Sequence, residues 1–222
     1  MINGVIGVLL VDDEELVRTG LRAIIDAEAD MRVVGEAADG SEVPGLVRAL
    51  RPDVVLMDVR MPDVDGIATT RHLTSSLPDP PRVLVLTTFG NDGHVYDALR
   101  AGATGFLLKR ARPAEIVRAV RTVAVGDSLL FPAAVRELVA TRGRDRRDGL
   151  RDAGLTDREG QVLRWMARGL SNAEIARELV LGVETVKTHV GNVLAKLGVR
   201  DRTQAVVAAY ESRFIDPDRP DD

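Results

Sequence analysis

Apolar positions in the first 125 residues follow two alternating patterns. Short, unbroken apolar runs predict strands that are buried on both faces, at about residues 5–11, 32–37, 53–57, 82–87 and 104–108. The segments between them carry apolar residues at helical spacing, which predicts helices at about 14–27, 41–50, 65–76, 92–101 and 113–125. Repeated strand–helix units of this kind predict an α/β domain built on a doubly wound parallel sheet.

The pattern changes after residue 125. Residues 126–152 predict a linker with one short amphipathic helix near 132–140, followed by a charged, glycine-containing stretch at 141–150. Residues 153–213 predict a compact all-α domain with helices at about 157–168, 172–179, 183–197 and 201–213. Thr156 and Ser171 stand at N-cap positions, with a glutamate three residues after Thr156. The acidic, proline-containing stretch 214–222 is expected to be a disordered tail.

Charged or hydroxyl-bearing residues end four of the five predicted strands. Asp12 and Asp13 follow the first strand, Asp58 the third, Thr87 the fourth and Lys109 the fifth. Parallel strands end at the same edge of a sheet, so these side chains are expected to converge. Carboxylate oxygens grouped in this way suit Mg²⁺, and the metal would neutralise them so that Asp58 can attack phosphorus. Lys109 and Thr87 would then bind the phosphoryl oxygens.

A simpler explanation is that strand ends carry polar residues because they reach solvent. That explanation is adequate for any one aspartate, and more so for Lys109 or Thr87 alone. It does not explain why four neighbouring strands end in complementary chemistry, so we favour a phosphate and metal site.

Four motifs at these strand ends resemble the receiver domain of bacterial two-component response regulators. They are Val11-Asp-Asp-Glu14, Met57-Asp-Val-Arg-Met-Pro62 with Asp65-Gly66, Leu86-Thr-Thr-Phe89, and Gly105-Phe-Leu-Leu-Lys109. The resemblance covers residues 4–125 and implies a flavodoxin-like, five-stranded sheet.

The resemblance also implies roles for individual residues. Asp58 matches the phosphoacceptor, and Phe106 matches an aromatic switch residue that turns inward when Thr87 engages the phosphoryl group. Without the family match, Phe106 could equally be an ordinary core aromatic. The implied ligands of Mg²⁺, directly or through water, are Asp12, Asp13, Asp58 and the backbone carbonyl of Arg60.

A second signal lies in the predicted helices at 172–179 and 183–197. Their apolar stripes, at Ile175, Ala176 and Leu179 and at Val186, Val190, Val193, Leu194 and Leu197, would pack together across a short turn. The second helix then exposes a polar face that fits a DNA major groove, with its N-terminal half nearest the bases. An ordinary helical hairpin with a solvated face would show the same spacing.

Residues 150–213 resemble the LuxR-type helix-turn-helix domain, through Leu155-Thr-Asp-Arg-Glu159, Gly169 to Ala176, Thr185 to Val190 and Ala195 to Gly198. The resemblance favours DNA binding over the solvated hairpin. Gly191 departs from the larger polar or basic residue of many relatives, so base readout is expected to shift to its neighbours. His189 fits a family position, although a lone histidine beside a helix is more often structural. The candidate DNA contacts are Ser171, Asn172, Glu184, Thr185, Lys187, Thr188, His189, Asn192, Arg200 and Arg202.

Composition narrows the classes of protein that remain. The 222 residues include no cysteine, which excludes disulfide scaffolds and thiolate chemistry, and no apolar run has the length of a membrane span. Residues 1–135 carry 14 Lys+Arg against 19 Asp+Glu, whereas residues 136–213 carry 15 against 11. The acidic first part and basic second part indicate that nucleic acid meets the second. A cytoplasmic protein without a leader is expected.

Together the two resemblances predict a NarL/FixJ-type response regulator. In this prediction a sensor histidine kinase phosphorylates Asp58, and the active form binds double-stranded promoter DNA as a homodimer, with RNA polymerase a further expected partner. The protein is not expected to be an enzyme.

The sequence argues against two alternative functions. A regulator with a ligand- or protein-controlled receiver would work without phosphorylation, but such receivers usually lose one of the five strand-end residues. A phosphohydrolase of haloacid-dehalogenase type would need a second aspartate two residues after Asp58, where this chain has Arg60.

Overall fold

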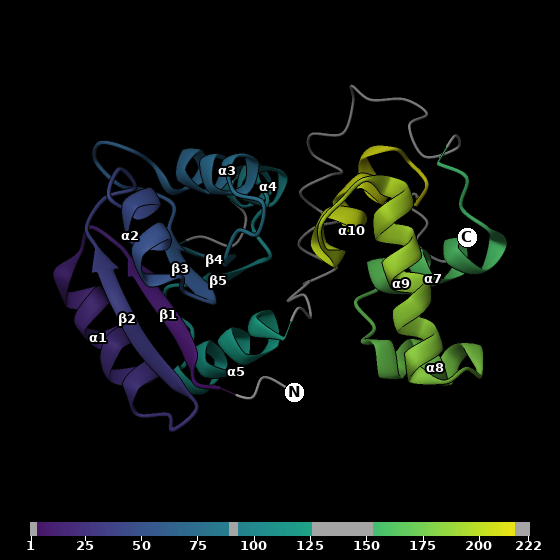
Figure 1. Cartoon of the computed structure of the whole chain (residues 1–222), viewed down its shortest axis with the longest axis horizontal. Coiled ribbons are helices and arrows are strands. Elements are labelled where there is room, and N and C mark those ends of the chain that lie inside the picture. The colour runs from purple at the N-terminus through teal and green to yellow at the C-terminus, as the bar shows by residue number, and fades with distance from the viewer. Residues whose placement is uncertain (1–3, 89–92, 126–152, 216–222) are drawn as a thin grey trace. The chain divides into compact units, whose positions relative to one another are not determined.

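The computed structural model describes residues 4–88, 93–125 and 153–215 (Figure 1). The chain divides into two compact units near residue 129, and each is described by itself. Within the described residues, no helix is both long and apolar enough to cross a lipid bilayer.

The first unit is built on a parallel sheet of β1 (Ile6–Val11), β2 (Met31–Ala37), β3 (Val54–Asp58), β4 (Arg82–Thr87) and β5 (Gly105–Leu108). The strand order is β2-β1-β3-β4-β5, with β3 at the centre. Val11 pairs with Met57 in register, so the residue that follows β1 lies beside the last residue of β3. Strands β1 and β3 are buried along their whole length because helices cover both faces of the sheet, whereas the edge strand β2 is partly exposed.

Five helices cover this sheet: α1 (Glu15–Asp26), α2 (Val43–Leu50), α3 (Gly66–Ser76), α4 (Gly93–Ala101) and α5 (Pro113–Ala124). Helices α1 and α5 lie on one face of the sheet, and α2, α3 and α4 lie on the other (Figure 1). Leu21 and Ile25 of α1 join Ile116, Val120 and Val123 of α5 in a core cluster against the strands.

The second unit contains α7 (Asp157–Ala167), α8 (Asn172–Leu179), α9 (Val183–Leu197) and α10 (Arg202–Glu211). Thr156 and Ser171 accept hydrogen bonds from the amides of Glu159 and Glu174, and each glutamate reaches back to complete a capping box. Fully buried Leu163, Met166, Ile175 and Val193 bring α7, α8 and α9 around one small core.

The predicted fold class is confirmed, and element boundaries agree with the sequence pattern to within about two residues. The largest differences are two residues each: α2 begins at Val43 rather than near 41, and the last helix ends at Glu211 rather than near 213. The predicted helix at 132–140 and the linker at 126–152 lie outside the described residues.

The expected disordered tail needs a correction at its start. Ile215 is buried, and its amide donates to the carbonyl of Ala209, while the Phe214 ring lies 5.0 Å from the guanidinium of Arg164. Both residues therefore belong to the folded unit, because their apolar side chains cover the end of its core. Residues 216–222 lie outside the described part of the chain.

Candidate functional sites

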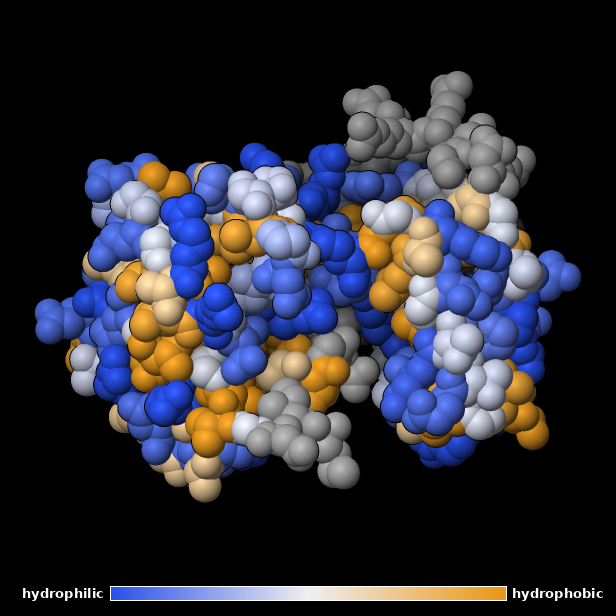
Figure 2. Space-filling view, in the orientation of Figure 1, coloured by the Kyte–Doolittle hydropathy of each residue, from blue (hydrophilic) through white to orange (hydrophobic). Residues whose placement is uncertain are grey.

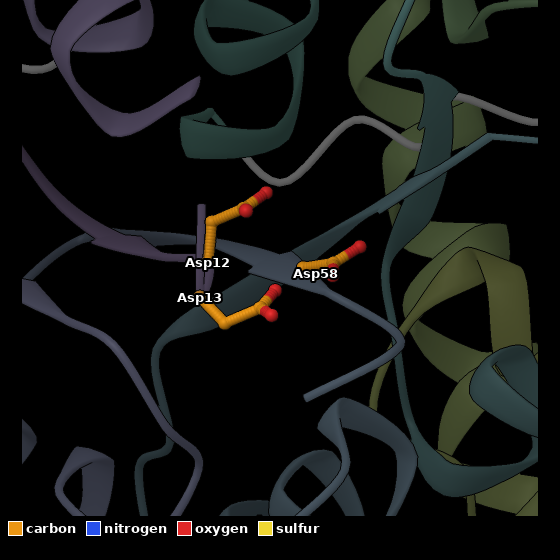
Figure 3. Close-up of side chains that lie close together, drawn as sticks. All are labelled: Asp12, Asp13 and Asp58. Carbon is orange, nitrogen blue, oxygen red and sulfur yellow. The ribbon is translucent and has the colours of Figure 1, made fainter. Parts of the chain in front are cut away.

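The carboxyl ends of β1 and β3 bring three acidic side chains together. Oxygens of Asp12, Asp13 and Asp58 lie within 4.8 Å of one another, and Figure 3 shows the three groups side by side at the strand ends. Asp12 is 0% exposed and Asp58 is 4% exposed, whereas Asp13 reaches solvent. The prediction that these residues converge is confirmed.

Lys109, which follows β5, lies among these carboxylates. Its Nζ is 2.8 Å from Asp12 Oδ2 and 3.3 Å from Asp58 Oδ2. Its backbone amide donates to the carbonyl of Thr87 at 2.7 Å, which fixes the ends of β4 and β5 together. The ammonium therefore compensates part of the negative charge at the strand ends and is held beside the candidate nucleophile.

The electrostatics of the cluster act on both members of the Lys109–Asp58 pair. Burial raises the pKa of Asp58 to about 6; Lys109 opposes this shift, and the charge of Asp12 adds to it. The pKa of Lys109 is raised, because its ion pairs with Asp12 and Asp58 outweigh its own burial. A second cation would therefore stabilise the ionised form of Asp58.

The donor set fits a hard divalent cation. Asp12 Oδ1 accepts from the amide of Glu14. Within the described residues the buried Oδ2 has no partner in hydrogen-bond geometry, although Lys109 Nζ is within ion-pair distance. An oxygen in this position, with two further carboxylates beside it, suits Mg²⁺. The geometry of this edge therefore supports the prediction that acidic side chains form a metal site here.

Thr87 and Phe106 lie on the neighbouring strands β4 and β5. Thr87 is the buried last residue of β4, as the sequence pattern predicts. Phe106 pairs with Val85 across β4 and β5, and its ring is buried rather than turned to solvent. Phe106 therefore lies two residues before the end of β5, on the strand next to Thr87.

Glu14 is a member of the site that the sequence analysis did not single out. Its Oε1 lies 3.3 Å from Lys109 Nζ, so Lys109 contacts three carboxylates in this structure. Glu14 is the last residue of the Val11–Glu14 motif, but a third acidic residue after a strand end is usually solvated, so its position alone did not predict a contact with Lys109.

In the second unit, α8 and α9 form the predicted helix-turn-helix. Val186 and Val193 of α9 are buried, and the opposite side of α9 exposes the predicted contacts Glu184, Thr185, Lys187, Thr188 and Asn192. Lys187 Nζ lies 2.8 Å from Glu184 Oε1. Hydrophilic and neutral residues follow α9 on the face shown in Figure 2. His189 is half-buried and Arg200 is exposed.

Arg202 requires a correction. Predicted to hold the DNA backbone, it is only 7% exposed, and its guanidinium donates to the carbonyl of Leu170 and, at 3.3 Å, to Asn172 Oδ1. It ties the start of α10 to the loop before α8, and it also occupies the side chain of Asn172. Ser171 is exposed, but its hydroxyl is engaged with Glu174 in the N-cap.

Comparison with known proteins identifies both units. A family described as "response regulator receiver domain" matches residues 8–121, and one described as "bacterial regulatory proteins, luxR family" matches residues 153–209. The transcriptional regulatory protein LiaR of Bacillus subtilis is 42% identical over 210 residues, which cover 95% of this chain and 99% of LiaR. The chain belongs to the luxR family of response regulators. The predicted family is therefore confirmed.

Other similar proteins are also response regulators. The response regulator protein VraR of Staphylococcus aureus is 41% identical to this regulator over 210 residues, with the same coverage of both chains. The crystal structure of ChrA, the response regulator of a heme-sensing two-component system, covers 96% of the regulator with a TM-score of 0.53 and 38% identity, and the match spans all of that chain. RcsB of Salmonella typhimurium covers 91% of it, and 97% of its own chain, with a TM-score of 0.55 and 25% identity. The regulator is a two-component response regulator that acts as a transcription factor.

Proposed function

We propose that Asp58 is the phosphoacceptor and that its phosphorylation controls DNA binding. The observation that carries this proposal is the position of Lys109 Nζ, 2.8 Å from Asp12 and 3.3 Å from Asp58 at one buried edge. A lysine in this position can bind a phosphoryl oxygen as the new bond to Asp58 forms. Thr87, at the adjacent strand end, supplies a hydroxyl to the same group.

The transfer starts from a phosphohistidine on a sensor kinase. Asp58 Oδ attacks phosphorus in line, the P–O bond forms, and the P–N bond breaks with its electron pair returning to the histidine nitrogen. Asp12, Asp13, Asp58 and the backbone carbonyl of Arg60 would hold Mg²⁺. That ion supplies positive charge at the carboxylates and at the transferring oxygens. Lys109 favours the ionised, nucleophilic form of Asp58, and a bound ion would add to this effect.

The acyl phosphate then shifts an equilibrium between two receiver conformations. The new dianionic group draws Lys109 and Thr87 towards it, and the space that Thr87 vacates lets Phe106 change its packing. The element beside this change is α4, which follows β4 in the chain. The phosphorylated receiver pairs with a second copy, which places two DNA-binding units on a two-part promoter site, where RNA polymerase is a further partner.

The DNA contacts come from the exposed side of α9 and from flanking cations. Lys187, Thr188 and Asn192 project from this side, near enough to its N-terminal half to meet base edges or phosphates. Glu184, Thr185 and His189 lie on or beside the same side, and Arg200 extends it beyond the end of α9. Ser171 is exposed just before α8, and the N-terminus of this helix would lie near a DNA phosphate.

Phosphorylation is tested directly by incubating the purified chain with phosphoramidate and Mg²⁺ and locating the adduct by mass spectrometry. The proposal expects one acid-stable, base-labile phosphoryl group on the peptide that contains Asp58, and none on Asp58→Asn. Labelling of Asp58→Asn to the level of wild type would contradict the proposal.

A further inference from the structure

The loop between β3 and α3, residues 59–65, carries the carbonyl of Arg60 that the proposed function assigns to the metal. Its two ends are closed on each other, because the amide of Gly66 donates to the carbonyl of Val59 at 3.0 Å. Gly66 packs so closely on the backbone of Asp58 that a Cβ there would collide with the Asp58 carbonyl oxygen. The ends of the loop are thus fixed to the strand that carries the candidate nucleophile.

The middle of this loop is held from another element. Asp39, in the turn after β2, is 8% exposed, and its Oδ2 accepts from the amides of Asp63 and Val64, both at 3.1 Å. Its Oδ1 accepts from the amide of Ser41 at 2.8 Å. The Ser41 side chain and these backbone amides hold the pKa of Asp39 far below its usual range, which favours the ionised carboxylate.

A glycine beside Asp39 lets the turn approach the loop. The amide of Gly40 donates to the carbonyl of Val64 at 3.3 Å, and a Cβ at this position would collide with that carbonyl and with the Thr69 hydroxyl. The turn of β2 and the loop of β3 therefore meet through three backbone amides and one carboxylate. None of these groups belongs to the proposed metal or phosphoryl ligands.

We propose that Asp39 is a positioning residue for the metal site, because its carboxylate holds the 59–65 loop in the conformation that presents the Arg60 carbonyl to the ion. This proposal rests on the proposed function. Outer groups that orient metal ligands typically change metal affinity about 10- to 100-fold when they are removed. Asp39 acts through the backbone, so an effect near the lower limit, about tenfold, is expected.

The alternative is that Asp39 stabilises the fold without affecting the metal. Asp53 provides the matched control, since its Oδ2 accepts from the amide of Gly7 at 2.7 Å at the opposite edge of the same sheet. Asp39→Ala and Asp53→Ala each remove a carboxylate that receives backbone amides. Only the first removes a contact to the 59–65 loop. Asp39→Asn, which keeps one acceptor oxygen but turns an amide group towards other donors, is an intermediate variant.

The experiment measures two quantities on the full chain. Hydrogen exchange without metal reports the protection of the Asp63 and Val64 amides, and the dependence of thermal unfolding on Mg²⁺ concentration reports the Mg²⁺ dissociation constant. Asp39→Ala is expected to lose that protection and to raise the dissociation constant about tenfold, with Asp39→Asn between it and wild type. Asp53→Ala is expected to match wild type in both.

Equal dissociation constants for Asp39→Ala and Asp53→Ala, each near the wild-type value, would overturn the role of Asp39 and leave the proposed function intact. A wild-type protein that gains no stability from Mg²⁺ would instead overturn the metal site itself. The two failures are therefore distinguishable in one series of measurements.

Discussion

Lys109 Nζ lies 2.8 Å from Oδ2 of Asp12, a carboxylate that is fully buried at the end of the first strand. Among the described residues, Lys109 is the cation that forms an ion pair with the Asp12 carboxylate; Arg18 lies nearby but donates to the Asp12 backbone carbonyl. The pair links the first strand to the fifth across the acidic edge. It makes the receiver's folding stability and its chemistry depend on the same residue.

Removing the ammonium should destabilise the receiver. Breaking one partner of a buried ion pair typically costs about 3–5 kcal/mol, because the other charge is left uncompensated. We therefore expect Lys109→Met to lower the free energy of unfolding by about 3 kcal/mol in urea without Mg²⁺. Arg110→Met, at the exposed next position, is the control and should change it by less than about 0.5 kcal/mol. Equal stability of the two variants would contradict the described role of Lys109.

Asp58 should make stability depend on pH with an unusual sign. Burial raises its pKa in the folded chain to about 6, above the ordinary value of 3.8, so the folded state binds a proton more tightly than the unfolded state. Above pH 6 the folded protein holds a charged Asp58 at a cost of roughly 3 kcal/mol, and this cost disappears as pH falls from 6 towards 4.

Asp58→Asn is therefore expected to be more stable than wild type at pH 7.5 without Mg²⁺, with the difference vanishing near pH 4. Urea unfolding across this range measures it. Saturating Mg²⁺ should shrink or reverse the difference at pH 7.5, because it stabilises the wild-type carboxylate. A difference that grows as pH falls would show that the direction of the Asp58 shift is wrong.

Lys187 should contribute to DNA affinity through a phosphate. Each such contact releases counterions, so Lys187→Ala should weaken binding to random-sequence duplex DNA. It should also reduce the magnitude of the slope of log K, the logarithm of the binding constant, against log salt concentration by about 1. Glu184→Gln removes the carboxylate 2.8 Å from Lys187 Nζ, and it should strengthen binding. Fluorescence anisotropy over a range of salt concentrations separates these effects. An unchanged slope for Lys187→Ala would exclude a phosphate contact.

Arg202 should behave as a structural residue. Because its guanidinium is buried against Leu170 and Asn172, Arg202→Met should lower the stability of the helical unit by about 1–3 kcal/mol. The only tryptophan, Trp165, lies in this unit, so its fluorescence during urea unfolding reports the change. A variant with wild-type stability and a lower salt slope for DNA would restore Arg202 to the DNA contacts.

Val180 offers a stabilising substitution. It is the C-cap after α8, with φ 52°, a left-handed conformation that is unfavourable for β-branched residues, and the residue is 90% exposed. Val180→Asn should therefore raise the stability of the helical unit by about 1 kcal/mol, again followed by Trp165 fluorescence. Val183→Asn, at a partly exposed helical position, should give no such gain. A loss of stability in Val180→Asn would mean that this conformation is not strained.

The sequence predicts the features of the structure that follow from periodicity and topology. Asp12, Asp58 and Lys109 could be expected to meet because the ends of parallel strands share one edge, and the capping boxes at Thr156 and Ser171 have a fixed spacing. Contacts that depend on the orientation of individual side chains could not be predicted from periodicity or topology.

Arg202 and Asp39 show this limit most clearly. An arginine at the start of a helix has the same pattern whether it meets a phosphate or, as here, the carbonyl of Leu170. Asp39-Gly40 indicates a turn, but its bonds to residues 63 and 64 arise only when two loops that are distant in the sequence pack together.

The most direct test of the central claim is a genome-wide DNA-binding profile of wild type beside Asp58→Ala, each in the source bacterium with and without the stimulus that activates the kinase. The account predicts that occupancy rises at a defined set of promoters in wild type after stimulation and remains at its basal level in Asp58→Ala. The same rise in occupancy with Asp58→Ala would contradict it and would show that the receiver controls DNA binding without phosphorylation.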